Sequence, residues 1–233
     1  MKQLILFSFI LCFTAVGSYA QSIYDIQNAV DFFKLHRSDS GDYKNVLDES
    51  DIEGTPFLND EFIEGTIYTY QKVQFNDIPL RYNIYNDELE FQTPDKQILA
   101  LTTPEIVEKA VIGENSCSYI PYQSGKKMKN GFFIVLAEGD VNLYSRPIVL
   151  FQKAKEAAAY KEPEPAKFVE RPNEYYLRVG MDAAEKIESK KDLVNFFSDH
   201  QEEIEAFIKN NKVKMGKEET LISLTKYYNS LPD

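Results

Sequence analysis

The stretch LRYNIYNDELEF (Leu80–Phe91) alternates apolar and polar residues on both sides of the pair Asn86-Asp87. Because both residues of this pair tolerate a positive φ, a two-residue hairpin loop is expected there. In that register Ile84 pairs with Leu89, Tyr82 with Phe91, Asn83 with Glu90, and Arg81 with Gln92. The first two pairs form an apolar face and the last two a polar face. This division predicts an antiparallel hairpin that covers a core with one face.

Short β-rich segments with turn signals continue on both sides of this hairpin. The expected segments are Thr66–Phe75, Gln97–Leu101, Tyr119–Tyr122, Phe132–Leu136 and Val141–Gln152, followed by a hairpin over Phe168–Arg178. Turns are expected at Asn76-Asp77, Glu138–Asp140 and Pro172-Asn173, and a brief helical turn at Thr103–Glu105. Val107–Ile112 either continues that helical turn or forms a further strand. Strands spaced in this way predict an antiparallel sandwich, half-barrel or barrel.

From Asp182 onward the apolar residues recur with helical spacing. Two capping-box-like starts, Ser189–Asp192 and Ser198–Gln201, precede the first two expected helices, and Asn210-Asn211 is expected to end the second. A third helix is expected over Glu218–Leu231. The three apolar faces consist of Leu193, Phe196 and Phe197, then Ile204, Phe207 and Ile208, and then Leu221, Leu224, Thr225 and Tyr228.

These patterns predict an α+β protein, with an antiparallel β sandwich or half-barrel followed by a short helical C-terminal region. The expected divisions are a signal peptide (1–20), an N-terminal helix with an acidic flexible segment (21–63), a β-domain (64–178) and a helical region (179–233). The N-terminal helix is expected over Ile23–Leu35. The Glu-Pro pairs within 154–165 predict a connector, because the residue before proline disfavours helix.

The first twenty residues follow the plan of a secretory signal peptide. Lys2 supplies the positive region, Leu4–Phe13 the apolar region and Ser18–Ala20 the cleavage site, which leaves Gln21 as the new N-terminus. Cys12 lacks the small residues that precede a lipid-anchored cysteine, so no lipid anchor is expected. No later stretch is apolar for long enough to span a bilayer. The expected location is periplasmic, outer-membrane-associated or secreted.

The chain contains 37 acidic and 26 basic residues, for a net charge of −11. This excess argues against a nucleic-acid partner, because phosphate neutralisation needs clustered Lys and Arg. The 15 Tyr and 16 Phe are enough for a sizeable core, which argues against global disorder. Without the leader only Cys117 is left, so no intramolecular disulfide can form. Cys117 is expected to be a small buried hydrophobe, with an intermolecular disulfide as the alternative.

Established catalytic and metal-binding motifs are absent from the sequence, and no cofactor is expected. His36 and His200 lie far apart and outside any motif. Ser124–Lys127 matches SxxK, but its glycine predicts a surface turn rather than a helix start. The acidic run Asp39–Asp60 lacks the alternate spacing of a calcium loop. One catalytic alternative stays open, an envelope hydrolase whose two carboxylates meet only in space.

The leading interpretation is a non-enzymatic binding module whose partner is an envelope protein, a lipid or a glycan. Lys126, Lys127 and Lys129 form a compact basic loop that suits an anionic partner, with an ordinary solvated connection as the alternative.

Tyrosines are the second set of candidate contact residues. Tyr175 and Tyr176 are adjacent on an expected strand, so they point to opposite faces. At most one therefore lies in the main core, and the other contacts a partner or covers the helical region. Tyr68 and Tyr70 share one strand face.

Three stretches carry a resemblance to known sequences. They are GTPFLNDEFIEGTIYTYQKVQFNDIPLRYNIYNDELEF (54–91), the run from EYYLRV (174–179) through ESKKDLVNFFSDHQEEIEAFIKNNKVK (188–214), and EETLISLTKYYNSL (218–231). The chain resembles a group of small secreted proteins of Bacteroidota that have no established activity. The resemblance implies a location in a Gram-negative cell envelope. It implies no catalytic residues.

Overall fold

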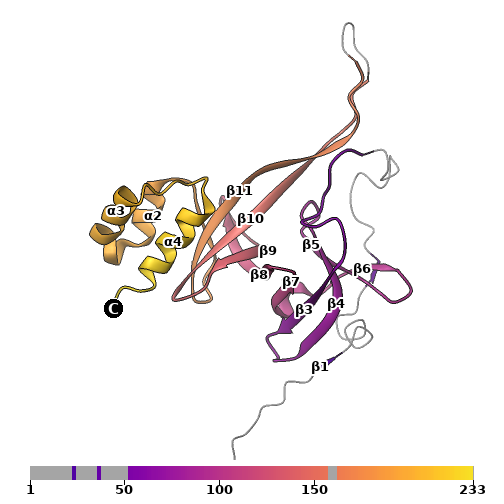
Figure 1. The fold of residues 1–233 in the computed structure, drawn as a ribbon, viewed down its shortest axis with the longest axis horizontal. Coiled ribbons are helices and arrows are strands. Elements are labelled where there is room, and N and C mark those ends of the chain that lie inside the picture. Colours follow the sequence, from indigo (N-terminus) through magenta and orange to yellow (C-terminus); the bar gives the residue numbers. More distant parts are fainter. Residues whose placement is uncertain (1–22, 25–35, 38–51, 157–161, 233) are drawn as a thin grey trace, which may run out of the picture.

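The computed structural model describes residues 23–24, 36–37, 52–156 and 162–232. In these residues an antiparallel sheet curls into a half-barrel, and three short α-helices near the C-terminal end lie beside it (Figure 1). The α+β prediction is therefore confirmed, with a half-barrel rather than a two-sheet sandwich.

The sheet has 12 strands. They are β1 (Ile23–Tyr24), β2 (His36–Arg37), β3 (Ile63–Thr69), β4 (Gln74–Asn83), β5 (Glu88–Gln92), β6 (Ile98–Ala100), β7 (Val107–Ile112), β8 (Asn115–Ser124), β9 (Lys127–Ala137), β10 (Val141–Gln152), β11 (Lys167–Val179) and β12 (Glu185–Ile187). Their spatial order is β12-β11-β10-β9-β8-β7-β3-β4-β5-β6-β2, and β1 pairs in parallel with β4. Neighbouring strands are mostly consecutive in sequence, as expected for a meander.

The helical region begins where its capping box predicts. The helices are α2 (Lys190–Phe196), α3 (Gln201–Asn210) and α4 (Glu218–Tyr228), and the short 3-10 turns are η2 (Pro104–Ile106) and η3 (Ser198–His200). Ser189 accepts a hydrogen bond from the Asp192 backbone, and the Asp192 carboxylate accepts from the Ser189 backbone. The second expected capping box is wrong: Ser198 begins η3, and α3 starts at Gln201 without a side-chain cap.

The hairpin at Leu80–Phe91 forms, with the expected faces but not the expected register. Tyr82 pairs with Leu89 and Leu80 with Phe91, a shift of two residues from the prediction. The loop is longer because Asn83 accepts a hydrogen bond from the Asn86 backbone, and Ile84 donates to Pro56 instead of to β5. A two-residue shift keeps each side chain on its face, since the pleat has period two.

Two other predicted turns are wrong. Asn76-Asp77 lies within β4, and the β3–β4 turn falls earlier, where Thr69 and Val73 pair. Pro172-Asn173 lies within β11, which pairs with β10 along its length. The register shifts between Arg146 and Ile148, so a bulge absorbs this proline without a turn. Val107–Ile112 is a strand, and the turn at Glu138–Asp140 forms between β9 and β10.

Three buried clusters make up most of the core. The half-barrel core includes Ile67, Phe75, Ile78, Leu80, Tyr82, Leu89, Phe91, Cys117 and Phe132. The helical core joins β9–β12 to the helices and includes Leu143, Tyr175, Leu177, Leu193, Phe197, Ile204, Ile208, Leu221 and Leu224. The aromatic core consists of Ile120, Tyr122, Phe133, Tyr144, Tyr176 and Ala184. Phe132 and Phe133 are neighbours in different clusters, so β9 has a core on each face.

Several expectations fall on residues that the structure does not describe. The signal peptide and Cys12 lie outside the described residues, as do most of the acidic run before Ile52 and residues 25–35 of the expected N-terminal helix. Ile23 and Tyr24 themselves are in β1, so the helix prediction is wrong there. Among the described residues no helix is long and apolar enough to cross a membrane.

Candidate binding site

Residues 52–58, which we call the strap, connect the two sides of the curled sheet. On one side the Glu53 backbone donates to Ala166 (3.0 Å) and accepts from Phe168 (2.8 Å). On the other side the Pro56 carbonyl accepts from Ile84 (2.8 Å). The strap therefore holds the start of β11 beside the β4–β5 loop, although five strands separate β11 from β4 in the sheet order.

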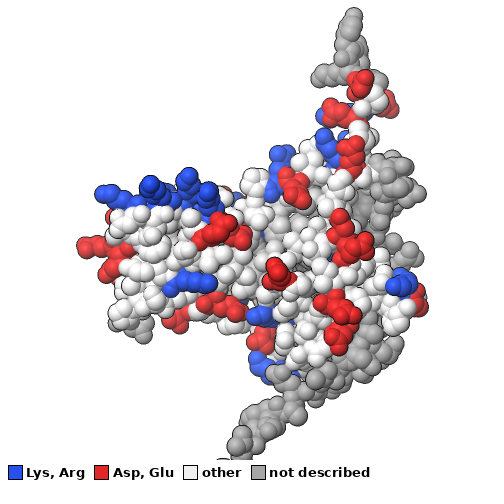
Figure 2. Space-filling model, viewed as in Figure 1, with Lys and Arg blue, Asp and Glu red and all other residues white. Residues whose placement is uncertain are grey.

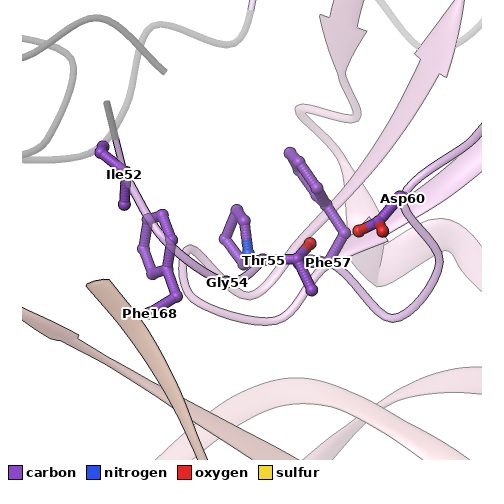
Figure 3. Close-up of a pocket in the computed structure, with 7 residues that line it drawn as sticks. Ile52, Gly54, Thr55, Phe57, Asp60 and Phe168 are labelled. Carbon is purple, nitrogen blue, oxygen red and sulfur yellow. The ribbon is translucent and has the colours of Figure 1, made fainter. Parts of the chain in front are cut away.

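A groove of about 400 Å³ lies along the strap. Its lining is mostly apolar and comes from Ile52, Gly54, Thr55, Pro56, Phe57, Asp60 and Phe168. Figure 3 shows Ile52 and Phe168 at one end and Asp60 at the other, with Thr55 and Phe57 between them. The groove combines an apolar wall with one exposed carboxylate, a composition typical of small binding sites.

Gly54 is required for the strap to approach β11 so closely. Its φ is +77°, and a Cβ at this position would lie 2.6 Å from the Phe168 carbonyl oxygen. Any other residue would face both left-handed strain and a collision with backbone that is held in the sheet.

The wall at Phe57 is fixed by a buried ion pair beneath it. The Arg81 guanidinium stacks on the Phe57 ring at 3.5 Å and on the Phe62 ring at 4.4 Å. Arg81 Nη2 lies 2.7 Å from Glu90 Oε2, and Glu90 Oε1 accepts from Asn83 Nδ2 at 2.9 Å. Glu90 is 1% exposed, and these bonds use both of its oxygens. The charges are thus neutralised internally while Phe57 is held in place.

The opposite wall is fixed by an aromatic triad. Phe168 lies 5.5 Å from the Tyr85 ring and 5.3 Å from the Phe151 ring, centroid to centroid. These tilted and edge contacts attach the β10–β11 ribbon to the β4–β5 loop. Both walls of the groove are therefore pre-formed.

A second polar cluster lies where the β4–β5 loop reaches β9 and β10. Asp87 Oδ1 accepts from the Tyr82 hydroxyl (2.8 Å) and from the Phe132 backbone (3.0 Å), while Asp87 Oδ2 lies 3.3 Å from Arg146 Nη2. Gly131 makes room, since a Cβ there would lie 2.6 Å from Asp87 Oδ2. Burial and the adjacent Asp87 charge raise the pKa of Tyr82 well above its ordinary value, so the hydroxyl stays a donor.

A further carboxylate, Glu174, lies near the same arginine. It accepts from the Tyr176 hydroxyl (2.9 Å) and pairs with Lys186 (2.8 Å). Burial opposes its ionisation, but the hydrogen bonds from Lys186 and Tyr176 outweigh this effect and lower its pKa. Arg146 stacks over the Tyr122 ring at 4.7 Å.

This arrangement bears on the hydrolase alternative. Glycoside hydrolysis needs one carboxyl group with a raised pKa that can donate a proton. The structure brings both carboxylates near Arg146: Glu174 lies opposite it on the neighbouring strand, and Asp87 forms an ion pair with it. Each of the two carboxyl groups pairs with a cation and accepts a hydrogen bond from a tyrosine, and the lowered pKa of Glu174 is the opposite of what a general acid needs.

Both candidate tyrosines are buried. Tyr175 is 9% exposed and packs in the helical core, whereas Tyr176 is 2% exposed and lies in the aromatic core. Of the two roles expected for the tyrosine outside the main core, Tyr175 has the packing role against the helical region. Tyr68 in β3 is half-buried, and Tyr70, in the turn that follows β3, is 43% exposed.

The basic loop forms the β8–β9 hairpin turn. Ser124 pairs with Lys127 across Gly125, whose φ is +61°, so the SxxK match is a surface turn as predicted. Lys126, Lys127 and Lys129 are all exposed. Gly125 lines a hollow with Gln123, Glu185, Lys186 and Glu188, which surrounds the loop with mixed charge.

Cys117 and His200 are the other candidate residues whose side chains the structure describes. Cys117 is fully buried in the half-barrel core, and burial raises its pKa to about 12. His200 is the last residue of η3, with its ring 5.8 Å from that of Tyr228. In the described ranges no three His, Cys, Asp or Glu side chains lie close enough to hold a metal ion.

Sequence reasoning missed both Arg81 and Asp87 as centres of polar clusters, and it missed the strap groove. Asp87 was assigned only to a turn, and the strap to an acidic flexible run. The signal that could have been used is the run Gly54-Thr55-Pro56-Phe57, which places two conformationally special residues beside an aromatic one.

Comparison with known proteins adds no assignment. No family model matches the chain, and searches of curated proteins and of solved structures find none that is similar. The geometry above is therefore the basis for any functional conclusion.

Proposed function

We propose that the protein is an exported binding module of the cell envelope that holds an apolar group of a partner in the strap groove. The observation that carries this proposal is the groove itself, with its apolar walls and the exposed Asp60 at one end. Such a site suits a partner that presents an aliphatic or aromatic group next to a positive charge. The acidic chain, with a net charge of −11, favours the same partner charge.

The state of the buried charges supports binding rather than catalysis. Glu90 pairs with Arg81 and accepts a hydrogen bond from Asn83. Asp87 accepts a hydrogen bond from Tyr82 and pairs with Arg146. Both clusters link separate parts of the chain, which is a structural task. The described residues that line the groove include no acid–base pair of the kind that nucleophilic or proton-transfer catalysis uses.

The proposed compartment rests on the sequence. The leader-like stretch Met1–Ala20 and the resemblance to secreted Bacteroidota proteins both support export to a Gram-negative envelope.

The test is quantitative capture from an envelope fraction with tagged protein that starts at Gln21. I52D places a charge on the apolar wall and D60K reverses the charge at the end of the groove. D140K, in the exposed β9–β10 turn, is the matched control for D60K. We expect the first two variants to lose at least three-quarters of a captured partner while D140K retains it, all with unchanged circular dichroism. Equal capture by all four proteins, or no partner for any, would contradict the proposal.

A further inference from the structure

A second hollow lies on the helical region, between α2 and α3. It has a volume of about 590 Å³. Its apolar floor comes from Val194 of α2 and Ile208 of α3, and Lys190, Lys191 and Lys209 surround it. The helices lie on the opposite side of the molecule from β4 and β5, so this hollow is separate from the strap groove (Figure 1).

The floor is a fixed surface rather than a gap between mobile side chains. Ile208 is 7% exposed and belongs to the helical core, and Val194 packs against the same core. The capping box at Ser189 sets the start of α2, which places Lys190 and Lys191 at the rim. An apolar group that enters the hollow would therefore contact atoms already held by the core.

The lysines of the rim are unusual in so acidic a protein. Among the described residues no ion pair joins Lys190, Lys191 or Lys209 to a carboxylate, although the chain has a net charge of −11. One carboxylate, Glu205, lines the hollow, and Gln201 donates to it at 3.2 Å. Figure 2 shows basic side chains gathered along the upper edge of the helical region.

We infer that the α2–α3 hollow binds an acidic segment of a partner protein, with an aliphatic side chain on the Val194–Ile208 floor and carboxylates at the lysine rim. Charge complementarity selects an anionic occupant. The concave shape favours a peptide chain, which can insert one side chain into the hollow. A planar anionic membrane is disfavoured, because it would touch only the rim. This inference goes beyond the proposed function, since it concerns another surface and a partner of opposite charge.

The experiment measures fluorescence anisotropy of a fluorescein-labelled peptide, EELLEELLEE, titrated with the protein from Gln21 to Asp233. The peptide KKLLKKLLKK has the same leucines and the opposite charge. Phosphatidylglycerol vesicles provide an anionic membrane. The triple variant K190E/K191E/K209E reverses the rim, and K126E/K127E/K129E makes the same change of charge on the β8–β9 loop. V194D tests the floor.

We expect the acidic peptide to bind, the basic peptide to bind at least tenfold more weakly, and the vesicles not to bind. K190E/K191E/K209E and V194D should each weaken binding of the acidic peptide at least tenfold. K126E/K127E/K129E should weaken it less than twofold. Three results would overturn the inference: no binding of the acidic peptide, equal loss in both triples, or binding of vesicles that the rim triple abolishes. None of these substitutions lies in the strap groove. The α2–α3 inference can therefore fail while partner capture through Asp60 still succeeds, and the reverse also holds.

Discussion

Substitution of Asp87 tests how the β4–β5 loop is fastened across the curl of the sheet. Asp87 bridges three parts of the chain, through the Tyr82 hydroxyl, the Phe132 backbone and Arg146. Tyr82 and Phe132 are each 1% exposed, so neither donor can turn to water when the carboxylate is removed. D87A therefore leaves two buried donors without an acceptor.

Each such orphaned donor costs about 1–3 kcal/mol, so the two together should lower the free energy of unfolding of D87A by about 2–6 kcal/mol. The left-handed φ of Asp87, +56°, adds about 1–2 kcal/mol for alanine. For a chain of this length, a loss of about 3 kcal/mol lowers Tm by roughly 6–12 °C. D87N keeps an oxygen acceptor and tolerates the left-handed region, so it should lose less than about half of this.

The assay is urea unfolding followed by circular dichroism on D87A, D87N, Y82F and Y82F/D87A. D140A, at an exposed turn, is the surface control and should stay within about 0.5 kcal/mol of wild type. Y82F removes one of the two orphaned donors, so D87A should cost about 1–2 kcal/mol less in that background. Wild-type stability for D87A, or an equal cost in both backgrounds, would refute the bridging role.

Four further predictions concern the groove walls and the core. R81M should cost about 3–5 kcal/mol because it leaves Glu90 buried without its cation, and R81M/E90Q should recover part of that loss in the same urea assay. G54A should destabilise the protein by about 1–2 kcal/mol more than G125A. Both glycines have a positive φ, but only a Cβ at position 54 would collide with backbone. Equal Tm values for the two variants would argue against the close strap contact. Cys117 should react with Ellman's reagent only after unfolding, and prompt reaction of the native protein would contradict its burial. Folding raises the pKa of Cys117 from 9.0 to about 12. The stabilising contribution of the thiol is therefore complete below pH 9 and is lost as the pH rises toward 12. The variant C117S should not show this loss of stability.

Local patterns in the sequence were sufficient for the elements whose boundaries depend on nearby residues. The capping box at Ser189 and the apolar face of Leu193 and Phe197 predict α2 correctly. The period-two alternation around Tyr82 and Leu89 predicts the correct buried face, because a two-residue slip leaves the face unchanged.

The register itself could not be predicted, because it depends on a distant contact. Pro56 accepts the Ile84 backbone hydrogen bond, and this competes with closing the hairpin at Asn86. The Pro172-Asn173 pair reads as a turn locally, but partner β10 and a bulge beside Arg146 keep β11 extended. In both cases tertiary hydrogen bonds override turn propensity.

The candidate sites could not be predicted from the sequence either, because they too depend on contacts between distant parts of the chain. The groove walls come from the strap and from β11, more than a hundred residues apart. Asp87 meets Arg146 only because the sheet curls, and Glu174 lies opposite Arg146 through the long-range pairing of β10 with β11. Single-sequence patterns indicate which residues are polar or apolar, and they carry no information about such encounters.

Site-specific photo-crosslinking tests the strap groove most directly. Thr55, between the two walls, is replaced by a photoreactive phenylalanine analogue, and Met181, which is 72% exposed outside the groove, serves as the control position. Both proteins are irradiated in an envelope fraction, and adducts are identified by mass spectrometry. A binding groove predicts one dominant adduct from position 55, absent from position 181 and lost when D60K is added. The same adducts from both positions, or none from position 55, would contradict the account.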